Sequence, residues 1–353
     1  MKQRIHMAND RLIDLSSDTA TRPSPDMRRY MAEAPVGDEQ RREDPTVNRL
    51  QEMVAELTGK EAALFLPSGT MCNAIAIKVH TQPGDEIILD RTAHPYTSEG
   101  GGPAALAGVS VALLDGVRGV FTAAQVESAI RHTGPHAPQS RLVSIENTTN
   151  AGSGKIWPLE TAREVTDIAR GHDLKTHMDG ARLLNAVVAS GIPATEWGAL
   201  VDTVWIDLSK GLGCPVGAVL AGTTEDMERA RRYKHLYGGA MRQAGIIAAA
   251  GVYALEHNVE RLREDHSNAR RLANGLAEIP GIEIDPEEIE TNIVFFDVAE
   301  TGRSAADIND AITERGVRMG GRGTRIRAVT HLDVTTDDID RALESLHEVV
   351  VSG

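Results

Sequence analysis

One stretch of the chain decides the fold that the sequence predicts, and it reads Ala63-Leu64-Phe65-Leu66-Pro67-Ser68-Gly69-Thr70. Its first four residues are apolar and predict a buried strand, and a helical pattern follows at Met71–His80. Further apolar runs alternate with helical stretches such as Leu159–Arg170, which favours a largely parallel sheet with helices on both faces. These strands are expected at Glu86–Asp90, Val109–Asp115, Arg141–Glu146, Lys175–Met178, Val201–Leu208 and Gly217–Ala221. The sequence therefore predicts a three-layer α/β domain.

The pattern changes after Met241. Two long helices are expected, at Ala244–Leu255 and Val259–Ile279, and the first pattern breaks at Glu256-His257-Asn258. We therefore place a domain boundary near residue 258, and expect an N-terminal arm over 1–45, a large domain over 46–258 and a smaller α+β domain over 259–353. The small domain is expected to hold strands near Ile282–Ile284, Asn292–Val298 and Arg325–Val329, and helices at Ala305–Arg315 and Thr336–Val350.

Composition argues against several classes of partner. The chain has 353 residues, enough for about two domains, and carries 37 basic and 51 acidic residues for a net charge of −14. Nucleic acids and anionic membranes bind basic surfaces, so this charge disfavours both. The longest apolar run, Ala244–Leu255, is too short to span a bilayer, and Met1–Asp10 lacks the apolar core of a secretory signal.

The cysteines point to a reducing compartment. Cys72 and Cys214 lie far apart in the sequence and show no metal-ligand spacing, so we interpret them as free thiols. We therefore expect a soluble cytoplasmic protein without a metal site.

The turn between the first strand and its helix is the first candidate for chemistry. Gly69 lets the backbone approach a ligand, and Ser68 and Thr70 supply hydroxyl groups. The unpaired N–H groups of the following helix favour an anion such as phosphate. Taken alone, the same pattern also fits a simple capped turn.

Two further candidates follow later strands. Asp179 stands at the end of a strand and before a glycine, where open α/β sheets bind ligands. Arg182 or a cofactor nitrogen is a suitable partner for its charge, although the carboxylate fits a helix cap equally well. Lys210 lies in a Gly-rich turn after an apolar strand, where burial lowers the pKa of a lysine and makes it a nucleophile.

Together these three features match what pyridoxal 5′-phosphate requires. A helix N-terminus holds the phosphate, a carboxylate keeps the pyridine nitrogen protonated, and a lysine forms an imine with the cofactor. We therefore expect this cofactor at the strand ends of one sheet.

The chain resembles a known family, the low-specificity L-threonine aldolases. These are pyridoxal-phosphate enzymes with the aspartate-aminotransferase-like fold, also called fold type I. The resemblance runs from Ile13 to about Val334 and rests on seven blocks. They are Ile13–Thr19, Glu43–Asn48, Lys60–Thr70, His177–Arg182, Leu208–Gly213, Gly238–Gln243 and Arg327–Val334.

The resemblance implies a role for each matching residue. Lys210 is the implied Schiff-base lysine, Asp179 the partner of the pyridine nitrogen, and His94 the residue that stacks on the pyridine ring. The remaining implied contacts are the phosphate with Ser68, Gly69, Thr70, Ser209 and, from a neighbouring subunit, Arg242; the ring oxygen with Arg182; and the substrate carboxylate with Ser17 and Arg327.

The implied reaction is the cleavage of an L-β-hydroxy-α-amino acid, such as L-threonine or L-allo-threonine, to glycine and an aldehyde. A β-eliminating lyase, in which Lys210 removes the α-proton, is the alternative with the same cofactor. A non-catalytic descendant of the fold is disfavoured because Lys210, Asp179 and Arg327 are all present. The resemblance also implies a homo-oligomer, a dimer of dimers with shared active sites.

Two departures from the family pattern bear on the substrate side chain. The usual Asn-Thr-His-Asn reads Asn147-Thr148-Thr149-Asn150. The missing histidine contacts the β-hydroxyl group in relatives, and the pKa of a threonine hydroxyl is too high for it to act as a base. Water, a phosphate oxygen or His94 remain as acceptors of the proton.

The second departure replaces Val-Tyr-Gly by Gln40-Arg41-Arg42. Our hypothesis is that Arg41 binds a polar or anionic group on the substrate side chain. The alternatives are that Arg41 pairs with Glu39 or Glu43, or faces a subunit interface.

Overall fold

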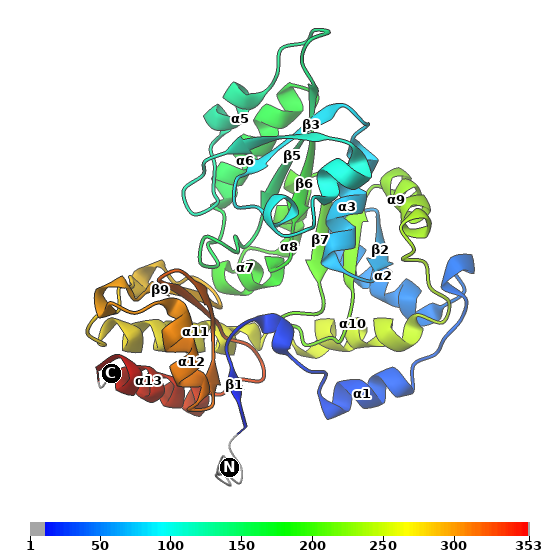
Figure 1. Ribbon diagram of the computed structural model, residues 1–353. Coiled ribbons are helices and arrows are strands. Elements are labelled where there is room, and N and C mark those ends of the chain that lie inside the picture. Colours follow the sequence, from blue (N-terminus) through cyan, green and yellow to red (C-terminus); the bar gives the residue numbers. More distant parts are fainter. Residues whose placement is uncertain (1–10, 352–353) are drawn as a thin grey trace. The chain divides into compact units, whose positions relative to one another are not determined.

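In the computed structural model, which describes residues 11–351, the chain forms two compact units (Figure 1). The large unit is Thr21–Arg263, and the small unit combines residues 11–20 with residues 264–351. The first ten residues of the expected N-terminal arm, and residues 352–353, lie outside the described part of the chain.

A seven-stranded sheet forms the centre of the large unit. Its strands lie in the order β2-β8-β7-β6-β5-β3-β4; β3 to β7 run parallel, and β8 is antiparallel to both of its neighbours. The mainly parallel sheet that the sequence predicts is confirmed. The strands are β2 (Ala62–Leu66), β3 (Asp85–Asp90), β4 (Ser110–Leu114), β5 (Gln139–Glu146), β6 (Lys175–Asp179), β7 (Thr203–Asp207) and β8 (Ala218–Gly222).

Helices cover both faces of this sheet because its strands are apolar on both sides. On β3, Ile88 packs into the core on one face, whereas Ile87 and Leu89 pack into the core on the other. The first core also contains residues of α2 (Pro45–Thr58), α5 (Ala123–Ala129), α6 (Leu159–Gly171), α7 (Leu183–Ser190), α8 (Ala194–Leu200) and α10 (Gly245–His257). The opposite face carries α3 (Gly69–His80) and α9 (Thr224–Leu236). No helix in residues 11–351 is long and apolar enough to cross a membrane.

A buried carboxylate fixes the start of α2. Asp44 is fully buried, and its Oδ1 accepts hydrogen bonds from the backbone N–H groups of Thr46 (3.1 Å) and Val47 (3.0 Å). Its Oδ2 accepts from the N–H groups of Gly37 (3.2 Å) and of Gly245 (2.8 Å), the first residue of α10. The side chain therefore caps one helix and joins it to another.

The small unit has a core of its own. Its antiparallel sheet has the order β11-β12-β9, and a separate parallel pair joins β1 to β10. Its helices α12 and α13 pack with these strands and with most of α11 around the second core. The elements are β1 (Ile13–Asp14), α11 (Leu262–Ala277), β9 (Ile293–Asp297), α12 (Ala305–Thr313), β10 (Val317–Arg318), β11 (Gly320–Arg322), β12 (Arg325–Val329) and α13 (Thr336–Val351).

The prediction of a strand near Ile282–Ile284 is wrong. Only Glu283 pairs, in a single bridge to Asp297. Gly281, with a φ of 89°, turns the chain just before this point, and a short 3-10 helix begins at Pro286. These two turns leave too few extended residues for a strand.

We expect the substitution Asp44→Ala to lower the free energy of unfolding by about 3 kcal/mol, because it removes a helix cap and leaves buried N–H groups without an acceptor. Urea denaturation measures the loss. Asp44→Asn keeps one acceptor oxygen and is expected to lose less. The control Asp285→Ala removes an exposed cap that accepts one hydrogen bond, and is expected to lose under about 1 kcal/mol. Equal losses at both aspartates would contradict this role of Asp44.

Candidate active site

Carboxylates end three neighbouring strands of the large sheet. Glu146 ends β5, Asp179 ends β6 and Asp207 ends β7, and Glu146 pairs directly with Asp179 across the two strands. All three side chains are buried. Since β5, β6 and β7 run parallel, their carboxyl ends meet at one edge, which is where open α/β sheets bind ligands.

Asp179 is held by the turn that follows it and by a helix. Its Oδ1 accepts from the N–H of Ala181 (3.0 Å), and its Oδ2 accepts from Asn73 Nδ2 on α3 (2.8 Å). Neither bond uses a cation. The arrangement leaves a buried carboxylate at the sheet edge, suited to a ligand that carries a protonated nitrogen.

Lys210 lies beside Asp207, three residues earlier. Its Nζ donates to Asp207 Oδ2 (2.6 Å) and lies 5.6 Å from the centroid of the Trp205 ring. Asp207 Oδ1 accepts from both the N–H (2.7 Å) and the Oγ (2.8 Å) of Ser209. Asp207 thus fixes the turn that carries both predicted residues.

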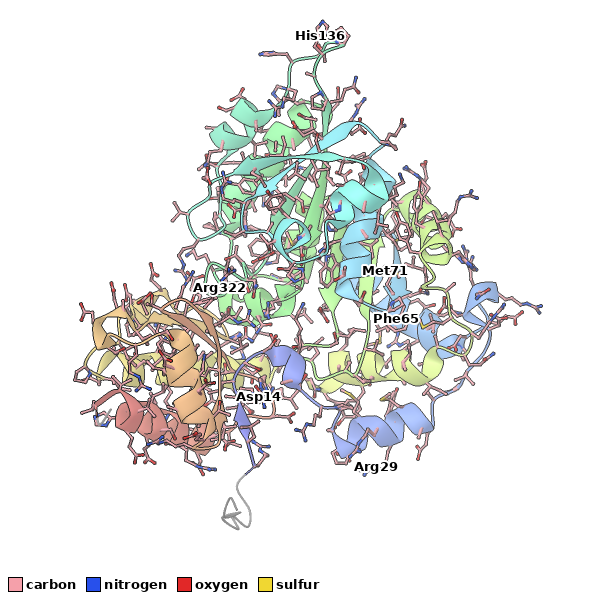
Figure 2. The ribbon with its side chains drawn as sticks, viewed as in Figure 1. Asp14, Arg29, Phe65, Met71, His136 and Arg322 are labelled. Atoms are coloured by element: carbon pink, nitrogen blue, oxygen red, sulfur yellow. The ribbon has the colours of Figure 1, made fainter. Side chains whose placement is uncertain are left out.

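The predicted phosphate turn is a capped helix start that admits no side chain at Gly69. Ser68 caps α3 by accepting from the N–H of Met71 (3.2 Å). A Cβ on Gly69 would lie 2.3 Å from Cη2 of Trp205. Figure 2 labels Phe65 on β2 and Met71 on α3, the two arms of this turn. Of the two alternatives from the sequence, the structure shows the capped turn, and the anion site stays a prediction.

His94 begins α4 (His94–Thr97) and is held by two glutamates. Its Nδ1 lies 2.8 Å from Glu99 Oε1, and its backbone N–H donates to Glu146 Oε2 (2.8 Å). Burial raises the pKa of Glu99, and burial together with the neighbouring Asp179 carboxylate raises the pKa of Glu146 to about 7. The hydrogen bond to Glu99 raises the pKa of His94.

Sequence reasoning missed four residues of this region. They are Asn73, Glu99, Glu146 and Asp207. The position of Glu146 and Asp207 at strand ends, which singled out Asp179, was a usable signal for both. Asn73 lies inside an apolar helix and Glu99 in a loop, and neither carries a local signal.

The other predicted residues occupy varied surroundings. Arg182 is buried directly before α7, and Thr70 is exposed in the first turn of α3. Thr149 is buried and its Oγ1 donates to the carbonyl oxygen of Arg118 (2.8 Å). That hydroxyl is therefore committed to the main chain.

Arg242 and Arg41 both approach Asp38. Arg242 Nη1 lies 2.9 Å from Asp38 Oδ2, and Arg41 Nε lies 3.9 Å from the same oxygen. Arg41 thus pairs with Asp38 rather than with Glu39 or Glu43. Its side chain is 73% exposed and that of Arg242 is 62% exposed, so both guanidinium groups remain accessible in the single chain.

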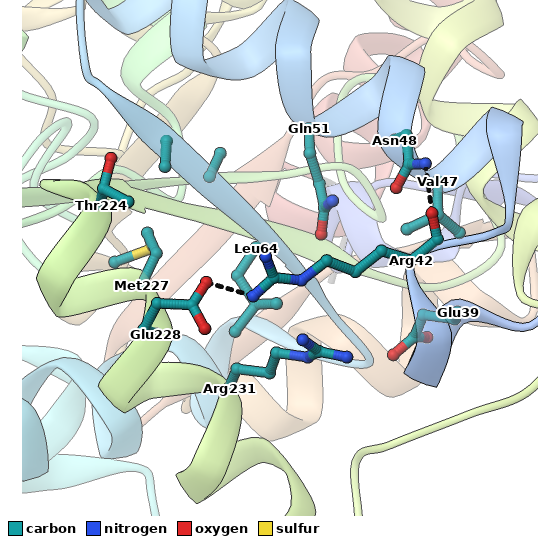
Figure 3. A pocket seen from close by; sticks show the side chains of 12 residues that line it. Glu39, Arg42, Val47, Asn48, Gln51, Leu64, Thr224, Met227, Glu228 and Arg231 are labelled. Carbon is teal, nitrogen blue, oxygen red and sulfur yellow. Dashed lines mark hydrogen bonds and ion pairs between the residues drawn. The ribbon is translucent and has the colours of Figure 1, made fainter.

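Helix α9 holds the loop that carries Arg41. Figure 3 shows Arg42 reaching Glu228, and Arg231 of the same helix donates to the carbonyl oxygen of Gln40. A cavity of about 220 Å³ lies beside this contact, lined by residues of α2, β2 and α9. The loop is therefore anchored on both sides of Arg41.

Ser17 and Arg327 belong to the small unit. Arg327 Nη2 donates to the carbonyl oxygen of Ser16 (3.0 Å), which ties β12 to the segment that follows β1. Ser17 Oγ accepts from the N–H (3.2 Å) and the hydroxyl (2.8 Å) of Thr19. Their role in binding a substrate carboxylate stays a prediction.

The residues present fit pyridoxal phosphate. A buried carboxylate at a strand end suits a pyridinium N–H, a lysine in the turn after the next strand suits an aldehyde, and N–H groups in the first turn of α3 suit a phosphate. The described residues contain no cluster of histidine, cysteine and acidic side chains arranged to hold a metal ion.

Comparison with known proteins agrees with this geometry. The family model described as "Beta-eliminating lyase" matches residues 14–300. The chain belongs to the beta-eliminating lyase family. Within that family, the low-specificity L-threonine aldolase of Escherichia coli K12 is 43% identical over 329 residues, which cover 93% of this chain and 96% of that protein. The resemblance to threonine aldolases seen in the sequence is thereby confirmed.

Solved structures confirm the fold. A threonine aldolase of Leishmania major aligns with a TM-score of 0.81 at 20% identity, covering 96% of this chain and 99% of that one. A serine palmitoyltransferase of Sphingomonas wittichii aligns with a TM-score of 0.75 at 18% identity, covering 97% of this chain and 88% of that one. This lyase thus has the predicted fold of pyridoxal-phosphate enzymes of fold type I.

We expect Gly69→Ala to lower the free energy of unfolding by about 1–3 kcal/mol and to weaken retention of pyridoxal phosphate, because the new Cβ must displace the Trp205 ring or the start of α3. Thermal unfolding and cofactor absorbance measure the two effects. In the control Gly171→Ala the new Cβ meets nothing within 4 Å, and stability is expected to change by less than about 0.5 kcal/mol. Unaltered cofactor retention in Gly69→Ala would argue against the phosphate site.

Proposed function

We propose that this protein is a pyridoxal-phosphate-dependent aldolase that cleaves L-β-hydroxy-α-amino acids to glycine and an aldehyde. The observation that carries the proposal is the edge of one sheet, where Lys210, the buried Asp179 and the N-terminus of α3 follow β7, β6 and β2. The name of the E. coli relative, a low-specificity L-threonine aldolase, supports the substrate class. L-Threonine and L-allo-threonine are the first candidates.

The bound cofactor would supply an electron sink for the bond that breaks at the α-carbon. The chain supplies position and charge. Asp179 would hold a proton at the pyridine nitrogen, Arg182 would lie near the ring oxygen, and Ser68, Gly69, Thr70 and Ser209 would hold the phosphate. Lys210 would anchor the cofactor and yield to the substrate amine, while Arg327 and Ser17 would bind the substrate carboxylate and so fix the bond to be broken.

The proton of the β-hydroxyl group needs an acceptor. Thr149 is unsuitable, since its hydroxyl donates to the main chain and has too high a pKa. His94 is half-exposed and its Nδ1 is bonded to Glu99, which leaves Nε2 for this task. We propose that His94, directly or through one water, accepts this proton.

A β-eliminating lyase is the second candidate, and the description of the matching family model favours it. In that reaction Lys210 would remove the α-proton of an amino acid and a group on the β-carbon would leave. The products would be ammonia and a keto acid, which distinguishes the two reactions.

We further propose that the enzyme works in the cytoplasm as a homotetramer with active sites shared between subunits. Two buried free cysteines, Cys72 and Cys214, support a reducing compartment. The largely exposed side chain of Arg242 supports a role across a subunit interface. The net charge of −14 continues to argue against nucleic acid as a partner.

We expect the purified protein to be yellow and borohydride to trap the cofactor on Lys210. We also expect the enzyme to release glycine and an aldehyde in equal amounts from a β-hydroxy amino acid. Lys210→Ala is expected to lower kcat/KM on the order of a thousandfold or more, because it removes the covalent partner of the cofactor. Amino-acid analysis and an aldehyde assay measure the products. Ammonia with a keto acid would favour the lyase, and a colourless protein without trapped cofactor would overturn both reactions.

We expect Arg41→Tyr to lower the rate on hydroxyaspartate relative to threonine by about tenfold, which corresponds to about 1.4 kcal/mol of lost charge-assisted bonding. Phenylserine is expected to gain relative to both. The control Arg29→Tyr changes another exposed arginine that has an acidic partner on its own helix, and it should leave the relative rates unaltered. Identical relative rates in Arg41→Tyr and the parent enzyme would refute the role of Arg41 in choosing the substrate.

A further inference from the structure

Asn73 lies at the centre of a buried hydrogen-bond network on α3. Its side chain is fully buried. Nδ2 donates to Glu99 Oε1 (2.8 Å) and to Asp179 Oδ2 (2.8 Å). Oδ1 accepts from Trp205 Nε1 (2.8 Å) and lies 3.2 Å from His177 Nε2. Every hydrogen-bonding position of the amide is therefore occupied.

The partners fix the orientation of this amide. An indole N–H can only donate, so the atom that faces Trp205 must be the oxygen. Two carboxylates can only accept, so the atom that faces Glu99 and Asp179 must be the nitrogen. The orientation is the same from both sides, and a flipped Asn73 would lose its bonds to Trp205, Glu99 and Asp179.

The same reasoning fixes the tautomers of His177 and His80, which continue the network. Since Asn73 Oδ1 accepts, His177 carries its proton on Nε2, and its Nδ1 accepts from Thr203 Oγ1 (2.9 Å). The Thr203 oxygen then accepts from His80 Nε2 (3.1 Å). Burial lowers the pKa of His177 to about 3 and that of His80 to about 4, so both rings are neutral near pH 7, as this series of hydrogen bonds requires.

On the other side, the network sets the tautomer of His94. Glu99 Oε1 accepts from Asn73 and also faces His94 Nδ1 at 2.8 Å. A carboxylate that accepts from an amide is an acceptor for the ring as well, so the proton lies on Nδ1. Nε2 of neutral His94 then keeps its lone pair. The Glu99 side chain is 3% exposed and that of His94 is 42% exposed, so a buried anchor presents a partly open ring.

We propose that Glu99 and Asn73 are positioning residues: they hold His94 as the Nδ1–H tautomer with Nε2 ready to accept a proton, and Asn73 links this pair to Asp179. A carboxylate that orients a histidine in this way is a general device of acid–base catalysis. The tautomer follows from the contacts alone, whereas its use in the reaction rests on the proposed function. The linkage means that Asp179 and His94, the two residues that would hold the pyridine ring, share one support.

Two variants separate the charge of Glu99 from its hydrogen bond. Glu99→Gln can keep an oxygen that accepts from both His94 and Asn73 but loses the negative charge. Glu99→Leu loses both. Glu86→Gln is the matched control, because the Glu86 side chain is also 3% exposed and pairs with Arg131 instead of a histidine.

The first measurement is nitrogen-15 NMR of the histidine rings in the cofactor-free protein, with His94→Gln used to assign the signal. We expect the Nδ1–H tautomer of His94 in the parent protein, in Glu99→Gln and in Glu86→Gln. In Glu99→Leu we expect a shift toward the Nε2–H form that free imidazole prefers. An Nε2–H ring in the parent protein, or an unchanged ring in Glu99→Leu, would overturn the proposal.

The second measurement is the rate of glycine formation. We expect kcat to fall about ten- to a hundredfold in Glu99→Leu with KM within about twofold, and to fall less in Glu99→Gln. Equal kcat in Glu99→Leu and Glu86→Gln would reduce Glu99 to a structural role. If the parent protein forms no glycine while the NMR result holds, the proposed function fails and the positioning of His94 stands.

Discussion

The candidate site depends on the contacts that Trp205 makes. Its ring occupies the space beside Gly69, where a Cβ would lie 2.3 Å from Cη2, and its indole N–H donates to Asn73 (2.8 Å). Its carbonyl oxygen lies 2.0 Å from where a Cβ on Gly180 would stand, and Lys210 Nζ is 5.6 Å from the ring centroid. One residue of β7 therefore lies against all three of the predicted motifs. The glycines at positions 69 and 180 are required by this packing as much as by any ligand.

The charges at this edge of the sheet are unevenly distributed. Glu99, Glu146 and Asp179 are buried close together, and such carboxylates are costly unless they accept hydrogen bonds. Amide and backbone N–H groups supply those bonds to all three. A few residues away, the N-terminus of α3 offers partial positive charge. The candidate site thus has a negative end and a partly positive end, an arrangement that fits a ligand with a protonated ring nitrogen and an anionic phosphate.

The sequence predicted the sheet and the ends of its strands for a physical reason. Strands buried on both faces are continuous apolar runs, so a polar residue at or just after the end of a run stands out. Asp179 and Lys210 were found in this way, whereas the same signal at Glu146 and Asp207 was missed. Asn73 could not be predicted in this way, because its partners Glu99 and Asp179 are 26 and 106 residues away in the sequence. The wrong prediction of a strand near Ile282–Ile284 has a different cause. The alternation of apolar and polar residues is present there, but turns on both sides leave too few extended residues to pair as a strand.

The loop at residues 39–42 is held in its path by contacts that do not involve the side chain of Arg41. Arg42 adopts a left-handed conformation with a φ of 61°, and this conformation costs a residue other than glycine about 1 kcal/mol or more. Its ion pair with Glu228 offsets part of that cost, and α9 also binds Glu39 and the carbonyl oxygen of Gln40. Arg41 lies between these anchored residues with its side chain exposed. Because the path of the loop is fixed by the neighbours of Arg41, the side chain at position 41 can be replaced without disturbing the fold, whereas Asp179 and Asn73 are each bound to several partners and cannot.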